Sequence, residues 1–319
     1  MTDSLAELSA QQDGDEAGRV DCGVIIVTYN SANDLNRLLG SLPAATEGLQ
    51  IRTVVVDNAS SDDTWAEILT RAEILAVQAG GNLGYAGAVN IGRDRVGPCD
   101  SVLILNPDLI LEPGSVVALL ETLKASNAGV AVPMILDEQG DLYPSLRREP
   151  TVIRALCDAC LGSRVAARPG WASEMIHDRT LYRRVQAVEW ATGAVLLISA
   201  ACDRDVGRWD DRRFFLYSEE TDFFRRARMA HYRCVYVPNA RAVHRLGGSG
   251  TSSELTALMA VNKVRYYQKY HGRPFSSLFR AAVALGELLR LARPSHRLAL
   301  RTVLWRRSWA ELPGGPRSS

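Results

Sequence analysis

The sequence predicts an α/β protein: a mostly parallel central sheet with flanking helices, followed by a C-terminal helical segment. The main observation is that short β-branched apolar runs alternate with helical patterns, which is typical of a parallel sheet covered on both faces. The 319 residues are 47% hydrophobic and 23% charged, as in ordinary globular proteins, so disordered, collagen-like and fibrous classes are excluded. The 37 basic and 36 acidic residues leave a net charge of +1, which gives no indication of nucleic-acid binding.

The first part of the chain supplies most strands and helices of the expected sheet. Residues 1–21 contain six acids against Arg19 alone and are expected to be a disordered acidic leader. Apolar runs then predict strands, and apolar residues at helical spacing predict helices, with Pro43 expected to end the first helix. The expected strands are 23–28, 53–56, 74–77, 101–105 and 129–132, and the expected helices lie around 35–42, 64–69, 86–94 and 116–123.

The second part of the chain is less regular. Residues 137–187 are loop-rich and contain many arginines, which suits an insertion or a surface that faces an acceptor. Strands are expected at 194–198, 214–217 and 232–237, the last closed by Pro238, and helices at 219–229, about 254–270, 278–293 and 297–309. We therefore expect one α/β domain over 22–250 and a basic helical region over 251–319.

The cysteines and the apolar runs bear on the location of the protein. Six cysteines at uneven spacing do not form a disulfide framework, and the lone Cys157-x-x-Cys160 lacks the second pair that a zinc site needs. The first residues are polar and acidic, so no secretory signal is expected. No run reaches the ~18 apolar residues that span a bilayer. We expect reduced thiols and a cytoplasmic protein, at most peripheral at the inner face of the cell membrane.

Polar residues follow four of the expected strands at the point where each strand ends. They are Thr28, Tyr29 and Asn30, then Asp57 and Asn58, then Asn82 and Gly84, and then Asn106, Pro107 and Asp108. In open parallel sheets, ligands bind outside the carboxyl ends of the strands. The sequence therefore predicts that four strand ends aim polar groups at one ligand-binding crevice.

Asp57 and the Asn106–Asp108 pair each allow two interpretations. Asp57 is either a helix cap or a ligand group, and because Asp62 and Asp63 are better placed as caps we interpret it as an acceptor for a nucleobase N–H or a ribose hydroxyl. Asn106 and Asp108 form either a simple turn or an oxygen pair for one hard cation. A carboxylate with one neutral oxygen suits Mg²⁺ or Mn²⁺ completed by substrate phosphates and water, and the position at a strand end favours this reading.

Glycines gather after the third expected strand, at Gly80, Gly81, Gly84 and Gly87. Their spacing is not G-x-G-x-x-G and they do not follow the first strand, so the dinucleotide fingerprint is absent. The segment is either a flexible loop or a place where backbone approaches a nucleotide closely, with Asn82 and Asn90 adding polar contacts.

Three acids, Glu219, Glu220 and Asp222, follow the aromatic residues of 214–217. Acids in the first turn of a helix complement its dipole. Three acids within four residues also repel one another, and beside aromatic side chains one of them is expected to have the raised pKa that suits a general base. His244 precedes the glycine- and serine-rich residues 247–250, a loop that could fold over a diphosphate. Structural and ligand roles both remain open for this histidine.

The order of these motifs resembles the inverting glycosyltransferases of family 2, and most of all their rhamnosyltransferase branch. The resemblance runs from about residue 22 to 250 and rests on 27–30, 56–60, 82–87, 105–108, 193–194, 215–222 and His244. It implies a GT-A fold, which is Rossmann-like, with a nucleotide-sugar-binding half at 22–133 and an acceptor and catalytic half at 134–250. It also implies a nucleoside-diphosphate-sugar donor and Mg²⁺ or Mn²⁺ as cofactor.

The resemblance further implies a role for each matching residue. The donor-binding set would be Thr28, Tyr29, Asn30, Asp57, Asn58, Asn82, Gly84, Tyr85, Gly87, Asn90, Asn106, Pro107 and Asp108, with Asp57 reading a pyrimidine base. Residues 106–108 take the place of the family's D-x-D motif with Asn first, so the metal ligand would be chiefly Asp108, together with Asn106 and His244.

The resemblance assigns the catalytic roles to the acid cluster. Family members often have Glu-Asp where this chain has Glu219-Glu220, so Glu220 takes the place of the base with one extra methylene, and this leaves the identity of the base open. Asp222 would support it or contact the acceptor. The base would take the acceptor's proton while the metal neutralises the departing nucleoside diphosphate, so the anomeric centre inverts without a covalent intermediate or a redox cofactor.

The basic C-terminal tail bears on the acceptor. Residues 271–319 contain nine arginines against Glu287 and Glu311. Residues 279–309 form either an amphipathic segment packed on the domain or a peripheral contact with an anionic membrane surface. Our hypothesis is a lipid-linked glycan acceptor in cell-envelope polysaccharide assembly, with dTDP-rhamnose as the leading donor and UDP-sugars next. A soluble aglycone as acceptor, a nucleotidyltransferase and a noncatalytic nucleotide-sugar-binding protein remain as alternatives.

Overall fold

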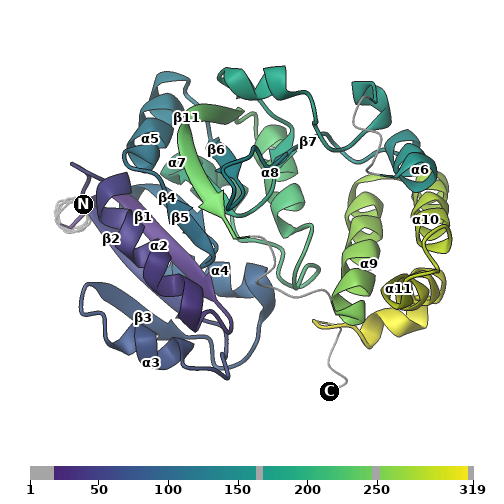
Figure 1. Ribbon diagram of the computed structural model, residues 1–319, viewed down its shortest axis with the longest axis horizontal. Helices are drawn as coiled ribbons and strands as arrows, with labels where there is room; N and C mark the ends of the chain where they lie inside the picture. Colours follow the sequence, from purple (N-terminus) through teal and green to yellow (C-terminus); the bar gives the residue numbers. More distant parts are fainter. Residues whose placement is uncertain (1–17, 163–167, 246–251, 315–319) are drawn as a thin grey trace, which may run out of the picture.

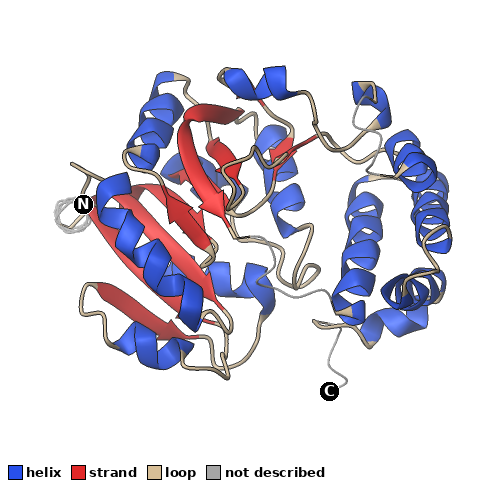
Figure 2. Ribbon diagram, in the orientation of Figure 1, coloured by secondary structure: helices blue, strands red, loops and turns tan. Residues whose placement is uncertain are grey.

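The protein is seen in a computed structural model, which describes residues 18–162, 168–245 and 252–314 (Figure 1). A central sheet carries helices on both faces, and a group of helices near the C-terminus lies beside it (Figure 2). The expected leader falls mostly on residues 1–17, which lie outside the described residues, as do the glycines and serine of 247–250. Val20 and Asp21, at the end of the expected leader, already belong to the first strand.

The central sheet is mostly parallel and has the strand order β3-β2-β1-β4-β10-β6-β11-β5, with β8 paired to β11. Strands β3, β2, β1 and β4 are all parallel, whereas β10 runs antiparallel between β4 and β6. Its strands are β1 Val20–Thr28, β2 Ile51–Asp57, β3 Ile74–Gln78, β4 Cys99–Leu105, β5 Leu109–Leu111, β6 Val130–Leu136, β8 Gln186–Ala187, β10 Val195–Ser199 and β11 Cys234–His244. A separate pair is formed by β7 Leu146–Arg147 and β9 Trp190–Ala191.

Two helical layers cover the sheet because its central strands are apolar on both faces, as the continuous β-branched runs predict. One apolar core joins the sheet to α2, α3 and α5, and the other joins it to α4, α7 and α8. The helices are α2 Ala32–Ala45, α3 Thr64–Leu69, α4 Gly84–Arg95, α5 Ser115–Ala125, α6 Val152–Leu161, α7 Ala200–Val206, α8 Glu219–Met229, α9 Ser253–Tyr270, α10 Arg273–Leu288 and α11 Pro294–Leu304. Short 3₁₀ turns lie at Gly170–Ala172, Arg179–Arg183 and Arg306–Ala310. The α/β fold with a C-terminal helical region is confirmed.

The C-terminal helices form a bundle to which the arginine-rich middle segment contributes. Helix α9 packs against α10 and α11, and α10 packs against α6 (Figure 1). Two small apolar clusters fill this bundle, one around Val261 and Val303 and one around Tyr267 and Phe279. Helix α6 lies within 137–187, which we expected to be loop-rich, so the sequence analysis missed it. The side chain of Thr151 caps its first turn by accepting from the N–H of Arg154.

Three local predictions are wrong for identifiable reasons. Residues 214–217 are not a strand, because Tyr217 and the following Ser218 have φ values of +70° and +72°, which no strand contains. Pro43 lies inside α2 and does not end it, since the backbone of Thr46 still bonds to the Leu42 carbonyl. Pro238 does not close its strand either: the pairing of β11 with β6 shifts register after Val237 and then resumes.

All six cysteines lie in the described part of the chain and are free thiols. Burial raises the pKa of Cys22 and Cys234 to about 12, which keeps both protonated and unreactive at neutral pH. No helix in the described ranges is both long enough and apolar enough to cross a bilayer.

Candidate functional site

The parallel register of β1 and β2 places Thr28 directly beside Asp57, as the strand-end pattern predicts. Asp57 is buried, and its carboxylate already accepts the Ser60 hydroxyl at 2.5 Å and the Ser60 backbone N–H at 3.2 Å. The Thr28 hydroxyl lies 3.3 Å from the same carboxylate. A carboxylate has about four acceptor positions, so these contacts leave room for little more than one further donor. Asp57 is therefore partly committed to holding its own loop.

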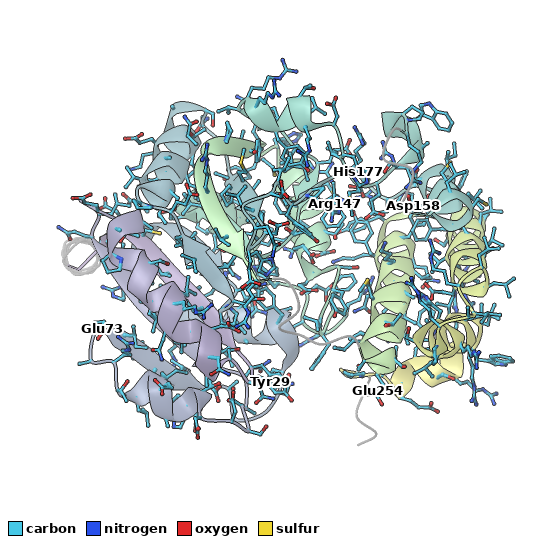
Figure 3. The ribbon with its side chains drawn as sticks, viewed as in Figure 1. Tyr29, Glu73, Arg147, Asp158, His177 and Glu254 are labelled. Atoms are coloured by element: carbon cyan, nitrogen blue, oxygen red, sulfur yellow. The ribbon has the colours of Figure 1, made fainter. Side chains whose placement is uncertain are left out.

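Tyr29 and Asn30 lie at the end of β1 with different surroundings. The Tyr29 ring is 51% exposed and projects outward (Figure 3). Asn30 has φ +52° and joins the loop after β2: its N–H donates to the Ser60 hydroxyl at 2.9 Å and its Oδ1 accepts the Ser61 N–H at 2.8 Å. The exposed ring offers a flat surface beside a rigid, hydrogen-bonded loop.

Asn58 and Asn82 join the end of β2 to the start of α4. The Asn58 amide donates to Asn82 Oδ1 at 3.0 Å, and its own oxygen accepts the Leu83 N–H at 2.9 Å. The strand-end residues of β1 and β2 and the beginning of α4 thus form one hydrogen-bonded edge, as expected.

The glycines of this edge have a purpose that we did not expect. A Cβ atom on Gly84, which has φ +75°, would lie 2.0 Å from the Phe215 carbonyl oxygen, to which Tyr85 donates its N–H at 2.7 Å. A Cβ on Gly87 would lie 2.8 Å from Leu83 Cβ. These glycines therefore permit a close approach within the chain itself; their predicted contact with a nucleotide stays a prediction.

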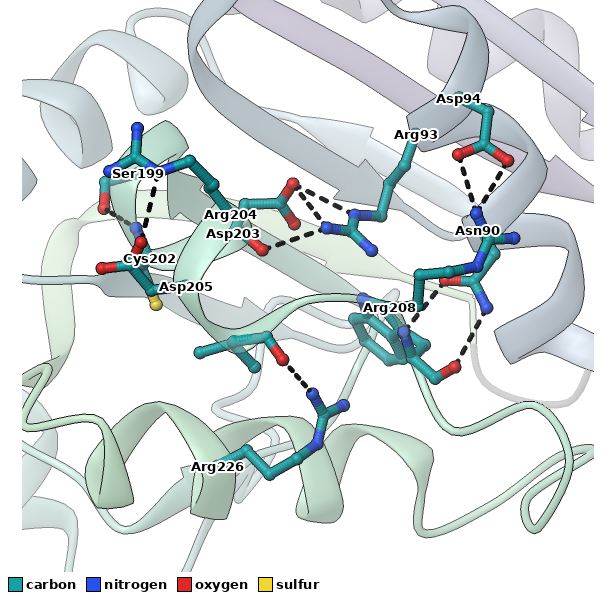
Figure 4. Close-up of polar contacts among 12 residues, drawn as sticks. Asn90, Arg93, Asp94, Ser199, Cys202, Asp203, Arg204, Asp205, Arg208 and Arg226 are labelled. Carbon is teal, nitrogen blue, oxygen red and sulfur yellow. Dashed lines mark hydrogen bonds and ion pairs between the residues drawn. The ribbon is translucent and has the colours of Figure 1, made fainter.

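Asn90 also departs from expectation. It is fully buried in α4, where it accepts the Trp209 N–H at 2.9 Å and donates to the Trp209 carbonyl at 3.0 Å (Figure 4). It also donates to Asp211 at 3.1 Å. Because its amide is paired with the 208–211 loop, Asn90 positions that loop and offers nothing to a donor.

Asp108 and His244 meet where β5 pairs with β11. Their contact is 3.1 Å between His244 Nε2 and Asp108 Oδ1, and the Arg245 N–H donates to the Asp108 carbonyl at 3.0 Å. The Nδ1 atom of His244 is buried and has no hydrogen-bond partner in the described ranges. Asn106 and Pro107 are half-buried beside them, and the Asn106 N–H donates to the Ala194 carbonyl at 2.9 Å. The structure therefore brings together Asp108 and His244, two of the three residues that we expected around a metal, with Asn106 two positions before Asp108 in the chain.

The protein offers few ligands for a metal ion at this position. No group of three or more His, Cys, Asp or Glu side chains within the described part of the chain could hold a metal ion. A carboxylate and a histidine with a free buried nitrogen nevertheless suit a cation that takes its remaining ligands from a diphosphate and water. The donor set thus fits a substrate-completed Mg²⁺ or Mn²⁺ site.

Glu219 and Glu220 begin α8 and are both largely withdrawn from water. Burial, and next the neighbouring Glu220 charge, raise the pKa of Glu219 well above its usual value. Burial also raises the pKa of Glu220, although the positive charge of Arg147 offsets part of the rise. One oxygen of each carboxyl is buried without a hydrogen-bond partner among the described residues. These two groups have the environment that the sequence analysis expected of a general base.

Tyr85 connects the acid pair with the strand-end residues. Its hydroxyl donates to the Gly193 carbonyl at 3.3 Å, and a Cβ on Gly193 would lie 3.4 Å from Glu220 Cβ. Burial and then the charges of Glu219, Glu220 and Asp108 raise the pKa of Tyr85, so these three carboxyls lie close enough to act on its hydroxyl. The candidate base and the Tyr85 hydroxyl therefore both lie against Gly193.

Asp222 does not share this space. It is fully buried and binds Arg226 at 2.8 Å, Lys269 Nζ at 2.6 Å and the Tyr270 hydroxyl at 2.7 Å. Because all of its neighbours are structural partners, Asp222 is not available to an acceptor. It fastens α8 to α9, which the sequence analysis placed in a separate region.

Helix α9 holds the other end of the same segment as well. The amide of Asn262 is buried and donates to the Leu216 carbonyl at 2.8 Å and the Tyr217 carbonyl at 3.3 Å. It thereby stabilises the left-handed backbone of Tyr217 and Ser218 just before Glu219. The sequence analysis missed Arg147, Asn262 and Lys269. A signal existed for Asn262: it is a polar residue on the apolar side of a helix, where burial demands a partner.

Comparisons with known proteins identify the family. The description "Glycosyl transferase family 2" matches residues 23–232. The chain is 33% identical over 255 residues to N-acetylglucosaminyl-diphospho-decaprenol L-rhamnosyltransferase of Mycobacterium tuberculosis, covering 76% of this chain and 82% of that protein. It is 26% identical over 229 residues to Rhamnosyltransferase WbbL of Escherichia coli K12, covering 69% of this chain and 82% of that protein.

Solved structures show the same fold at low identity. The crystal structure of GalNAc-T7 with UDP, GalNAc and Mn²⁺ has a TM-score of 0.60 at 14% identity over 89% of this chain and 56% of that chain. The mannosyltransferase PcManGT from Pyrobaculum calidifontis, in complex with GDP-Man and Mn²⁺, has a TM-score of 0.53 at 17% identity over 91% of this chain and 76% of that chain. The fold is GT-A-like, and the chain belongs to glycosyltransferase family 2.

Proposed function

We propose that this glycosyltransferase transfers a sugar, with inversion, from a nucleoside-diphosphate donor to a hydroxyl group of a lipid-linked glycan. The observation that carries the proposal is the pair of carboxyls at the start of α8: Glu219 is buried, Glu220 is half-buried, and Glu220 lies against Gly193, whose carbonyl accepts from Tyr85. Binding alone does not need a carboxyl with a raised pKa, whereas removal of a proton from an alcohol is helped by one such base.

The donor would lie along the edge formed by the ends of β1, β2 and β4. Asp57 keeps capacity for one further donor, which suits a nucleobase N–H, and the exposed Tyr29 ring can lie against a base or a sugar ring. Asn58 and Asn82 keep the edge in place, and Asn106, Pro107 and Asp108 complete it on the side of the diphosphate. In such sheets this edge is where ligands bind.

Asp108 and His244, with Asn106 beside them, would hold Mg²⁺ or Mn²⁺. When bound, such a cation stabilises the negative charge that builds up on a departing diphosphate. The protein's own contribution is to orient these two ligands through the β5–β11 pairing, which fixes His244 opposite Leu109. With Nε2 donating to the Asp108 carboxylate, the unpartnered Nδ1 of His244 is an acceptor, left to bind a water or the cation.

Glu220 would be the base and Glu219 its protonated neighbour. Two adjacent buried carboxyls do not ionise together, and Arg147 favours the charged form of Glu220. Glu220 then takes the proton of the acceptor hydroxyl as that oxygen bonds to the anomeric carbon. The bond from this carbon to the diphosphate oxygen breaks on the opposite face, so the configuration inverts.

The choice of substrates rests on the relatives. The mycobacterial relative is named as an L-rhamnosyltransferase acting on N-acetylglucosaminyl-diphospho-decaprenol, and WbbL is a rhamnosyltransferase. These names favour dTDP-rhamnose over UDP-sugars as the donor and a lipid diphosphate-linked sugar as the acceptor, as in cell-envelope polysaccharide assembly.

A lipid-linked acceptor requires the site to lie near a membrane, and residues 279–309 would provide a peripheral contact. Leu288, Leu289, Leu304 and Trp305 are each about half exposed or more, and arginines interleave with them. Trp309, by contrast, packs inside the bundle: its ring N–H donates to the Thr302 carbonyl at 2.7 Å. A basic surface with exposed apolar residues suits anionic lipid headgroups at the cytoplasmic face.

A thermal-shift panel tests the donor part of this proposal. The protein is heated with dTDP-, UDP- and GDP-sugars, each with and without Mg²⁺ or Mn²⁺, because a ligand that binds only the folded state raises Tm. We expect a metal-dependent rise with dTDP-rhamnose, which Glu220→Gln retains while losing turnover. If no nucleotide sugar raises Tm, or if Glu220→Gln turns over as fast as the wild type, the proposal is wrong.

A further inference from the structure

A cavity of about 570 Å³ lies between the loop before α8 and helix α9, outside the site described above. It is lined by Asp210, Arg212, Arg213, Arg265, Gln268 and Gly314. Its size falls within the range of small-molecule sites, roughly 300–1,000 Å³. Three of these six residues are arginines, so the lining gathers positive charge.

The charge of Arg265 is the least compensated in the lining of this cavity. It is partly buried, and within the described ranges it bonds only to neutral groups: Asn262 Oδ1 at 3.0 Å and the Trp309 carbonyl at 3.2 Å. Its guanidinium also lies over the Trp309 ring, 5.5 Å from the centroid. Burial and the nearby positive charge of Arg213 lower the pKa of Arg265, so its charge is held in an unfavourable place.

The one acid in the lining does not neutralise these arginines. The Asp210 carboxylate is bound by Lys269 Nζ at 2.7 Å, and Arg213 reaches it only at 4.0 Å. Lys269 and Asp210 therefore compensate each other, with Asp222 as a second partner of the lysine. The lining keeps the positive charge of Arg212, Arg213 and Arg265, which suits a ligand with more than one negative charge.

The cavity adjoins the catalytic segment through short contacts. Gly314, in its lining, approaches Phe215 so closely that a Cβ would lie 2.3 Å from Phe215 Cβ. The Phe215 carbonyl in turn accepts the N–H of Tyr85, and the same segment leads to Glu219 and Glu220. A molecule anchored in the cavity would therefore lie next to the segment that leads to the carboxyl pair.

We propose that this cavity binds the diphosphate of the lipid-linked acceptor. Arginine binds phosphate oxygens through two parallel N–H bonds, and a diphosphate can engage more than one guanidinium at once. The lining comes from residues 210–213, α9 and the end of the described chain, whereas the donor edge comes from β1, β2 and β4. The cavity is thus separate from the donor's own diphosphate. This assignment rests on the proposed function, because it takes a lipid-linked acceptor as given.

Titration calorimetry on the full chain tests the assignment, with a saturating nucleoside diphosphate and Mg²⁺ present so that the donor edge is filled. Three probes are titrated. Farnesyl diphosphate represents the lipid diphosphate, inorganic pyrophosphate represents the diphosphate without a lipid, and farnesol represents the lipid tail without a diphosphate. The variants are Arg213→Gln and Arg265→Gln, and the matched control is Arg37→Gln, an exposed arginine of α2. Arg213 is exposed, so its replacement leaves the fold intact even if loss of Arg265 disturbs Trp309.

We expect Arg213→Gln to weaken binding of both diphosphates by about tenfold to a hundredfold, as for loss of a charged hydrogen bond. Its affinity for the nucleotide sugar should equal that of Arg37→Gln. Three results would overturn the proposal. Arg213→Gln could bind farnesyl diphosphate as tightly as wild type does, or wild type could bind farnesyl diphosphate no more tightly than farnesol. Arg213→Gln could also lose affinity for the nucleotide sugar alone. Failure of the proposed function itself is a separate outcome: wild type would then bind no nucleotide sugar, whatever Arg213→Gln does to pyrophosphate.

Discussion

Replacement of Asp222 by Asn tests whether this residue stabilises the fold or acts on the acceptor. The carboxylate of Asp222 is 0% exposed and binds Lys269, Tyr270 and Arg226 at 2.6, 2.7 and 2.8 Å. An amide of the same size keeps the shape but removes the negative charge and presents a donor to groups that are themselves donors. Two cations then lose their partner at the junction of α8 and α9.

The size of the effect follows from the burial of the three charges. Removal of one partner from a buried ion pair costs about 3–5 kcal/mol. Here the side chains of Lys269 and Arg226 are 21% and 20% exposed, and Lys269 retains Asp210 at 2.7 Å, so part of this cost is avoided. We expect a loss of about 2–4 kcal/mol in unfolding free energy. For a chain of this size that corresponds to a decrease in Tm of about 3–6 °C.

Thermal unfolding measured by circular dichroism gives the result, with Asp94→Asn as the matched control. Asp94 pairs with Arg208 at 2.8 Å on the surface, where such pairs contribute little, so its Tm should stay near that of wild type. Nucleotide-sugar affinity, measured well below the Tm of Asp222→Asn, should be unchanged. An Asp222→Asn protein with the wild-type Tm but no turnover would refute the reasoning, because Asp222 would then act on the acceptor.

Three further predictions concern the acid pair, the clamp from α9 and the basic tail. Burial raises the pKa of Glu219 and Glu220 above the usual 4.5, so the folded state binds more protons than the unfolded state and stability falls as pH rises through and above that value. Glu219→Gln should therefore raise Tm at pH 7 relative to wild type but not at pH 4, and a gap in Tm independent of pH would contradict this. Asn262→Ala removes the donor to the Leu216 and Tyr217 carbonyls and should lower kcat more than it lowers donor affinity. An unchanged kcat would mean that Asn262 does not hold Glu219 and Glu220 in place for catalysis. Trp305, 60% exposed, should be needed for sedimentation with anionic vesicles, whereas Met229→Ala, an equally exposed apolar control on α8, should sediment as wild type does.

Much of the fold follows from local patterns. The runs that became β1, β2 and β4 are β-branched and apolar on both faces, and a strand buried in a parallel sheet is the structure that such runs favour. Helix α8 begins at Glu219 and ends at Met229, as the acids of its first turn and its apolar spacing predict. In these segments local preference and tertiary packing agree.

The errors arise where distant residues decide local structure. Residues 214–217 have the aromatic composition of a strand, yet Asn262 on α9 holds two of their carbonyls in a bend. Gly84 is required by Phe215, and Asn90 is paired with Trp209, so each has a structural role within the protein. No window of neighbouring residues contains these partners.

Some features of the candidate site also follow from local sequence, whereas others depend on distant residues. The strand-end rule places Thr28 beside Asp57 and predicts one polar edge, because parallel strands end on the same side of a sheet. The meeting of Asp108 with His244 depends on the pairing of β5 with β11, which lie more than a hundred residues apart. The attachment of Asp222 to α9 required knowledge of how the C-terminal helices pack, so the sequence analysis grouped it with Glu219 and Glu220.

The most direct test of the account is transfer of labelled rhamnose from dTDP-rhamnose, with Mg²⁺ or Mn²⁺, to an N-acetylglucosaminyl-diphospho-prenol by wild type and Glu220→Gln. The account predicts label in the lipid product, with the anomeric configuration inverted, for wild type alone, while Glu220→Gln still binds the donor. Retained configuration in the product, or equal transfer by Glu220→Gln, would contradict the claim that this carboxyl takes the acceptor's proton.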